Sequence, residues 1–298
     1  MKIGSYILSV ILTLLLIFTV IGFGIVYTAN TSLDAGRTVK IAEDLNLSET
    51  VHQNIENYFA DMYSATGIPA WVYMKSLTPE WVSTAVKSQI RAGFEGFKHQ
   101  DRLIAAPFTD EQLNPSLNAD IAQFYYDYAA ENSIETDSAF DEKILQVQRE
   151  TQDKVLEFTD VFMFRKLYSQ GVYEQIRNIT SKDIMRFVLA GIAIVGAAII
   201  GIILLINRKN KPFALYWTGI AAIIAGVIEI IPCIYIRKTK YFDGFVVKKE
   251  VYTVVTSFLY SLNDILFNVG LCTTVIGALV LILFGITRAL TRLSVNNE

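Results

Sequence analysis

The chain has 298 residues, of which 52% are hydrophobic and only 18% are charged. This balance excludes a disordered chain and argues against a fully soluble enzyme, because long apolar runs must be buried somewhere. The net charge of −3 is unevenly divided: residues 31–180 carry 23 acidic and 13 basic residues, whereas the rest carries 6 acidic and 13 basic residues. We therefore expect an acidic soluble part, a basic membrane part and no nucleic-acid partner.

The first apolar run extends from about Ile3 to Tyr27 and is long enough to cross a bilayer as a helix. A cleaved signal peptide is the alternative. However, the run is too long for a signal core, and the TANTSLDA segment that follows has no clean cleavage site. We expect an uncleaved anchor, with residues 1–29 as the first transmembrane helix.

Residues 30–183 show helix start signals and 3.6-residue periodicity, without the alternation typical of strands. Thr78–Pro79 and Asn114–Pro115 are typical helix starts, because a capping side chain precedes a proline where no N–H is needed. The apolar spacing predicts a long helix from near Asp137, with Gly171 as its C-terminal stop. We expect this segment to be an extracytoplasmic bundle of four or five helices.

Three further apolar runs follow, and each can form a spanning helix. Their approximate bounds are 187–206, 213–236 and 267–286. The predicted organisation of this part is a three-helix transmembrane region (184–290) with a short cytoplasmic loop (207–212) and a basic outer loop (237–250), then a cytoplasmic tail (291–298).

The distribution of basic residues predicts the orientation in the membrane. Six of them flank the spans on one side: Lys2, Arg208, Lys209, Lys211, Arg288 and Arg292. Five lie in the loop on the opposite side: Arg237, Lys238, Lys240, Lys248 and Lys249. Together with the acidic residues that follow the first span, this difference favours a multi-pass cell-membrane protein with both termini in the cytoplasm and residues 30–183 outside.

Polar residues inside the predicted spans form the candidate site. Glu229 lies in the third span, where a carboxylate is costly and normally faces a bundle interior or a water-filled cavity. Asp264 and Asn268 lie four residues apart in the fourth helix, so they share one face with Ser261 and Cys272. We expect a polar vestibule with Glu229 as its deepest ionisable group. The alternatives are a structural ion pair for Glu229, an interfacial position for Asp264 and helix-joining hydrogen bonds for Asn268.

No catalytic or metal-binding motif is found in the sequence, and we expect no cofactor and no bound metal. Cys233 and Cys272 lie separately in apolar runs, and His52 and His99 have no further ligand residues at metal-site spacing. The predicted cytoplasmic parts are too short for a nucleotide-binding domain, so a signal carried inward must pass to another protein.

These observations lead to three functional hypotheses. The first is a non-enzymatic membrane protein whose acidic helical domain binds a partner or ligand and couples it to the four-helix membrane bundle, as an accessory or sensor subunit. The alternative is an ion- or proton-coupled transporter or channel subunit that uses Glu229, and the third is a membrane-embedded enzyme. The expected partners are the lipid bilayer and either a second protein or further copies of the chain, since small-residue stripes in the spans fit both internal packing and oligomerisation. The ligand is not identified by the sequence.

Overall fold

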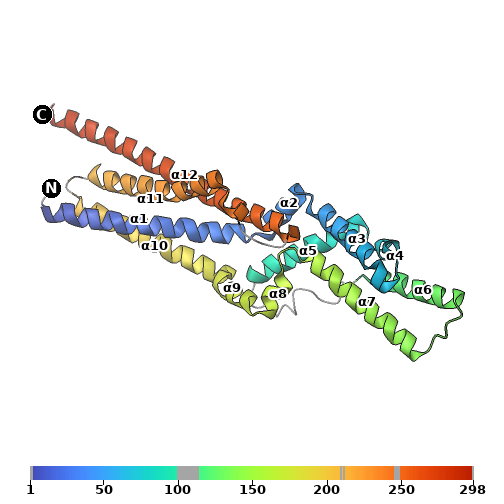
Figure 1. Cartoon of the computed structure of the whole chain (residues 1–298). Coiled ribbons are helices and arrows are strands. Elements are labelled where there is room, and N and C mark those ends of the chain that lie inside the picture. Colours follow the sequence, from blue (N-terminus) through green and yellow to red (C-terminus); the bar gives the residue numbers. More distant parts are fainter. Residues whose placement is uncertain (1–2, 99–113, 209, 211, 245–248, 297–298) are drawn as a thin grey trace. The chain divides into compact units, whose positions relative to one another are not determined.

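The computed structural model describes residues 3–98, 114–208, 210, 212–244 and 249–296, and every regular element in these ranges is a helix (Figure 1). The elements are, in chain order, α1 (Ile3–Ser32), α2 (Ala35–Asp44), α3 (Leu47–Thr66), α4 (Ala70–Met74), α5 (Pro79–Lys98), α6 (Pro115–Glu131), α7 (Ser138–Thr159), α8 (Phe164–Ser169), α9 (Val172–Thr180), α10 (Lys182–Ile206), α11 (Pro212–Thr239), the 3-10 helix η2 (Tyr241–Gly244) and α12 (Lys249–Asn296). The predicted all-α class is confirmed. So is the presence of four helices that are long and apolar enough to cross a membrane: α1, α10, α11 and α12.

The helices form two compact units. Unit 1 contains Met1–Ser32, Thr180–Phe245 and Leu259–Glu298, and unit 2 contains Leu33–Ile179 and Val246–Phe258. Unit 1 therefore holds α1, α10, α11 and most of the candidate span in α12, and unit 2 holds the shorter helices α2 to α8 and nearly all of α9. The domain limits drawn from the sequence and the side of the membrane on which unit 2 lies stay predictions.

In unit 1, α1 packs against both α10 and α11. The contact is apolar and is made by Leu12, Leu16 and Ile17 of α1 together with side chains such as Ile203 of α10 and Ala221 of α11. Small residues on α11, such as Ala221, allow the helix backbones to approach closely, which is common where membrane helices associate.

Glycines also bring α11 and α12 into direct contact. A Cβ atom placed on Gly226 would lie 2.5 Å from the carbonyl oxygen of Gly270, and one on Gly219 would lie 3.1 Å from that of Gly277. The first distance leaves no room for a side chain, and the second is tighter than an ordinary contact, so the two helices pack backbone to backbone. On α10, in contrast, a Cβ on Gly201 would meet nothing within 4 Å.

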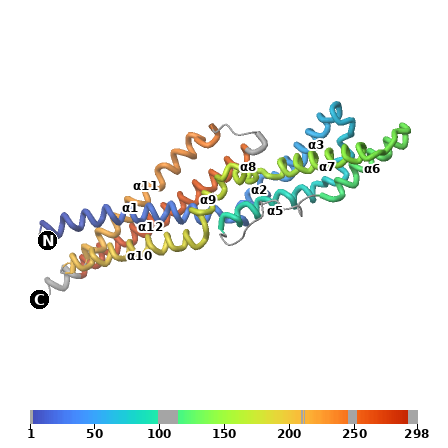
Figure 2. The backbone as a smooth tube through the Cα atoms, turned by 90° about the horizontal axis from the view of Figure 1, so that it is seen from below, coloured from blue at the N-terminus to red at the C-terminus, as the bar shows by residue number. Residues whose placement is uncertain are grey.

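Unit 2 has one apolar core to which α2 to α9 and the beginning of α12 contribute. The predicted helix starts are confirmed. Thr78 Oγ1 accepts the N–H of Trp81 at 3.2 Å, and Asn114 Oδ1 accepts the N–H groups of Ser116 and Leu117 at 3.1 and 3.3 Å. In this unit α7 lies beside both α3 and α6 (Figures 1 and 2).

The long helix predicted from near Asp137 to Gly171 is wrong in about its last third. Asp137 caps α7 as expected, by accepting the N–H of Phe140 at 2.9 Å, but the helix ends at Thr159. The reason is Asp160, whose carboxylate accepts backbone N–H groups of the following helix and so favours a new helix start over continuation of the old one. Gly171, with φ of 71°, follows the short α8 instead.

The last helix is longer than the predicted fourth span of residues 267–286. α12 is continuous over 48 residues from Lys249 to Asn296. Its residues up to Phe258 belong to unit 2, where the Val254 side chain is buried in the core, and its residues from Leu259 onward belong to unit 1. One helix therefore contributes to the packing of both units.

Candidate functional site

The predicted intramembrane carboxyl group of Glu229 is buried in unit 1. Only 3% of the residue is exposed, although it lies in the candidate span α11. Neither Oε1 nor Oε2 has a hydrogen-bond partner among the residues that the structure describes. A buried polar group without a partner is costly, so Glu229 is the least satisfied ionisable group of this unit on geometric grounds.

The carboxyl group lies against α1, and the Cβ atom of the same residue lies against α12. A Cβ placed on Gly24 of α1 would lie 2.0 Å from Glu229 Oε1, so the carboxylate occupies the space that a side chain at position 24 would need. From the other side, a Cβ on Gly270 of α12 would lie 3.0 Å from Glu229 Cβ. One turn beyond Gly24, Thr28 is buried and its hydroxyl also has no hydrogen-bond partner within the described part of the chain.

The other two predicted site residues lie elsewhere on α12. Asp264 Oδ1 accepts a hydrogen bond from Arg237 Nη2 at 2.6 Å, and both side chains are well exposed. Asn268 is exposed. Next to Asp264, Asn263 is buried against α11 and donates a hydrogen bond to the carbonyl oxygen of Cys233 at 3.2 Å.

Sequence reasoning missed Asn263, Gly24 and Thr28. A signal for Asn263 is present, because Asn263, Gly270 and Gly277 recur every seven residues and mark the face that packs on α11. Gly24 and Thr28 have the small-residue spacing of four on α1. That spacing indicates that another helix can pack closely against α1 at this point. It does not indicate that this other helix is α11, which carries Glu229.

A cavity of about 430 Å³ lies beside this region in unit 1. Cys233, Arg237, Asn263 and Asp264 are among its lining residues, whereas Glu229 is not. The ion pair of Arg237 with Asp264 thus borders the cavity, and the Glu229 carboxyl group is a separate buried feature.

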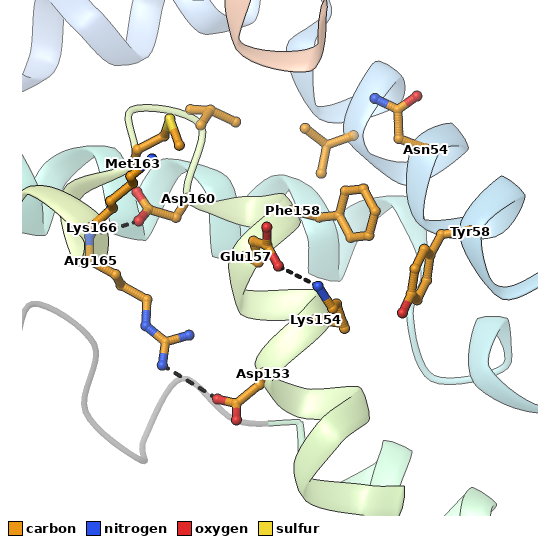
Figure 3. Close-up of a pocket in the computed structure, with 12 residues that line it drawn as sticks. Asn54, Tyr58, Asp153, Lys154, Glu157, Phe158, Asp160, Met163, Arg165 and Lys166 are labelled. Atoms are coloured by element: carbon orange, nitrogen blue, oxygen red, sulfur yellow. Dashed lines mark hydrogen bonds and ion pairs between the residues drawn. The ribbon is translucent and has the colours of Figure 1, made fainter. Parts of the chain in front are cut away.

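A second cavity, of about 610 Å³, lies in unit 2 and has the size of a small-molecule site (Figure 3). Val51 of α3 and Phe158 of α7 give it an apolar surface, and Asn54 and Tyr58 of α3 add polar groups. Charged residues line the rest of it and pair with one another: Lys154 with Glu157 at 2.7 Å and Arg165 with Asp153 at 3.4 Å.

Asp160 fixes one wall of this cavity (Figure 3). Its Oδ1 accepts the N–H of Phe164 at 2.9 Å, and its Oδ2 accepts the N–H of Arg165 at 2.8 Å. Burial raises the pKa of this carboxyl group, while the two backbone hydrogen bonds and the Arg165 charge oppose that rise. The two hydrogen bonds that Asp160 accepts hold the short connection between α7 and α8 in place. This connection also contains Met163, whose φ is 55°.

An aromatic cluster in unit 2 joins this connection to α12. Phe162 and Phe164 flank Met163, and their rings lie 5.1 and 5.3 Å from that of Phe94 on α5. Phe258 of α12 completes the cluster, with its ring 5.8 Å from Phe162 and 5.5 Å from Phe94. Edge-to-face pairs at these separations add to the stability gained by burial. The segment that lines the cavity is therefore packed directly against the beginning of a helix that continues as a candidate span.

In the described ranges, no group of three or more His, Cys, Asp or Glu residues is placed to hold a metal ion. His99 lies outside these ranges. No protein-family model, curated protein sequence or solved structure matches the chain. The described residues thus offer two candidate features for function, the cavity of unit 2 and the buried Glu229 carboxyl group.

Proposed function

We propose that the chain is a non-enzymatic multi-pass membrane protein in which unit 2 binds a ligand or protein partner and couples this binding to the membrane helices. The observation that carries the proposal is the aromatic cluster of Phe94, Phe162, Phe164 and Phe258. A species bound in the cavity would contact Val161 and neighbouring residues of the α7–α8 connection. Any shift of that connection changes the packing around Phe258, and hence acts on α12.

The chemistry of the cavity indicates the kind of species that would bind. Its apolar surface would contact a hydrocarbon or aromatic portion, while the paired charges offer both donors and acceptors to a polar one. A ligand or peptide side chain with both kinds of surface fits this arrangement. As part of the same proposal, unit 2 lies outside the cytoplasm, because the basic loop of residues 207–212 favours the inner side of the membrane.

The first test is native mass spectrometry of the full chain purified in mild detergent, with proteomic identification of any bound protein. Asn54→Trp would fill the cavity from a half-buried position of α3, and it should remove the bound species. Asn57→Trp makes the same change on an exposed face of α3 outside the cavity, and this variant should retain the species. Equal retention by both variants would show that the cavity is not the binding site.

The coupling step needs a separate readout. Phe258→Ala should leave binding in place but abolish the change in hydrogen exchange of residues 259–290 that accompanies release of the bound species. A chain that forms homo-oligomers, carries no bound species and moves ions through liposomes only when Glu229 is intact would instead support the transport hypothesis.

A further inference from the structure

The Glu229 carboxyl group is not part of the proposed binding site in unit 2, and a negative charge on it would need compensation. It is buried in a candidate span, and neither of its oxygens accepts a hydrogen bond from the described residues. Taking an ionised carboxylate out of water without a partner costs several kcal/mol. The group must therefore be compensated by a cation, by hydrogen-bond donors or by a proton.

The ionisable residues of the neighbouring helices do not supply the cation. On α11 itself, Cys233 lies one turn away and cannot become positive, Arg237 is committed to Asp264 of α12 at 2.6 Å, and Lys238 is exposed in the last turn of the helix. Asp264 has the same charge as Glu229 and cannot compensate it.

The helices α1 and α10 give no cation either. Between Ile3 and Ser32, α1 contains no Asp, Glu, Lys, Arg or His, and its titratable side chains are those of Tyr6 and Tyr27, both of which are exposed. The charged residues of α10 all lie in its first two turns and are exposed, namely Lys182, Asp183 and Arg186. Thr28 adds one buried hydroxyl on the face of α1 that carries Gly24. One carboxyl and one hydroxyl group are too few ligands for a hard metal ion, which takes six or more oxygens.

We propose that Glu229 is a reversible proton-binding site of unit 1, with the proton as its ligand and the carboxyl group neutral at neutral pH. Binding forms an O–H bond on one carboxyl oxygen, using a proton delivered by water. Release breaks that bond, returns the proton to water and leaves the negative charge on the carboxylate.

The contacts of the carboxyl group give this reaction a structural consequence. The neutral group fits against Gly24 of α1, while the Cβ atom of Glu229 packs against Gly270 of α12. The charged group would have to be solvated, which requires these helices to separate locally or the side chain to leave its position. Proton release and loosening of the contact with α1 are therefore coupled, whatever unit 2 binds.

Infrared spectroscopy of the full chain in liposomes tests this assignment, because a protonated carboxyl group has a carbonyl stretch that a carboxylate lacks. At neutral pH the unmodified chain should show this band, and Glu229→Gln should lose it. Asp264→Asn, which changes an exposed, ion-paired carboxylate, should retain it. Asp160→Asn separates any contribution from the buried carboxyl group of unit 2.

Two further results decide the interpretation. Glu229→Asp keeps a carboxyl group and should shift the band, which identifies it even if the Gln variant does not fold. A band that is absent from the unmodified chain at neutral pH would show that Glu229 is charged and would overturn the proposal.

Discussion

At the scale of single residues, Asp160 determines the path of the chain beside the unit 2 cavity. Its two carboxylate oxygens accept hydrogen bonds from the backbone N–H groups of Phe164 and Arg165, and the hydrogen bond from Phe164 is buried. Asp160→Ala removes both acceptors and leaves those N–H groups without partners. We expect the free energy of unfolding of unit 2 to fall by about 2 kcal/mol, since an unsatisfied buried donor costs ~1–3 kcal/mol. Chemical unfolding of the full chain in detergent would measure this change.

Asp153→Ala provides the matched control, because it removes an aspartate from the rim of the same cavity. Asp153 is exposed, and the hydrogen bond that it accepts from the Arg165 side chain is long, at 3.4 Å. Exposed ion pairs contribute about 0–1 kcal/mol, so this variant should unfold almost like the unmodified chain. If both variants lose the same stability, the capping role of Asp160 is incorrect.

At the scale of helices, glycine determines how α11 and α12 pack. A methyl group at position 226 would lie 2.5 Å from the Gly270 carbonyl oxygen and 2.8 Å from the Thr274 amide nitrogen. Backbone atoms cannot turn aside as a flexible side chain can, so Gly226→Ala must push the helices apart. Overpacking of this kind costs about 1–3 kcal/mol, and we expect a loss of thermal stability in detergent within that range.

Gly191→Ala makes the same substitution on α10, where the added methyl group would meet nothing within 4 Å. This variant should match the unmodified chain or slightly exceed its thermal stability, because alanine has the higher helix propensity. A Gly226→Ala variant as stable as Gly191→Ala would show that α11 and α12 are not in backbone contact.

Features encoded within a few residues could be predicted from the sequence, whereas features that depend on distant residues could not. The caps at Thr78 and Asn114 are local, and the spans follow from apolar length alone. The end of α7 was missed because Phe158 and Phe162 continue the apolar spacing past Asp160, whose capping role becomes visible only in three dimensions.

The candidate site follows the same rule. Glu229 could be identified because it is a single acidic residue in an apolar run. Its neighbour Gly24 could not, because nothing in the local sequence links α1 to that part of α11. Asp264 and Asn268 drew attention by their polarity, although the face of α12 that packs on α11 is the one with Asn263. Periodicity shows which residues share a face, but it does not show what that face contacts.

At the scale of the whole molecule, the chain passes between the two units within helices as well as in loops. The division falls inside α9, between Ile179 and Thr180, and inside α12, between Phe258 and Leu259. Helices transmit displacement along their axis better than flexible linkers do, which is why coupling between the units is the function that we propose. The direction of that coupling depends on the side of the membrane on which unit 2 lies.

Cysteine labelling of intact cells determines that side. In a Cys233→Ser, Cys272→Ser background, Gln146→Cys places a thiol on the exposed face of α7, and Asn210→Cys places one in the exposed connection between α10 and α11. A membrane-impermeant maleimide should label Gln146→Cys in intact cells, because the acidic unit is expected outside, and Asn210→Cys only after the cells are opened. Labelling of Asn210→Cys alone in intact cells would reverse the orientation. Unit 2 would then respond to a cytoplasmic species, and the same helices would carry its signal outward.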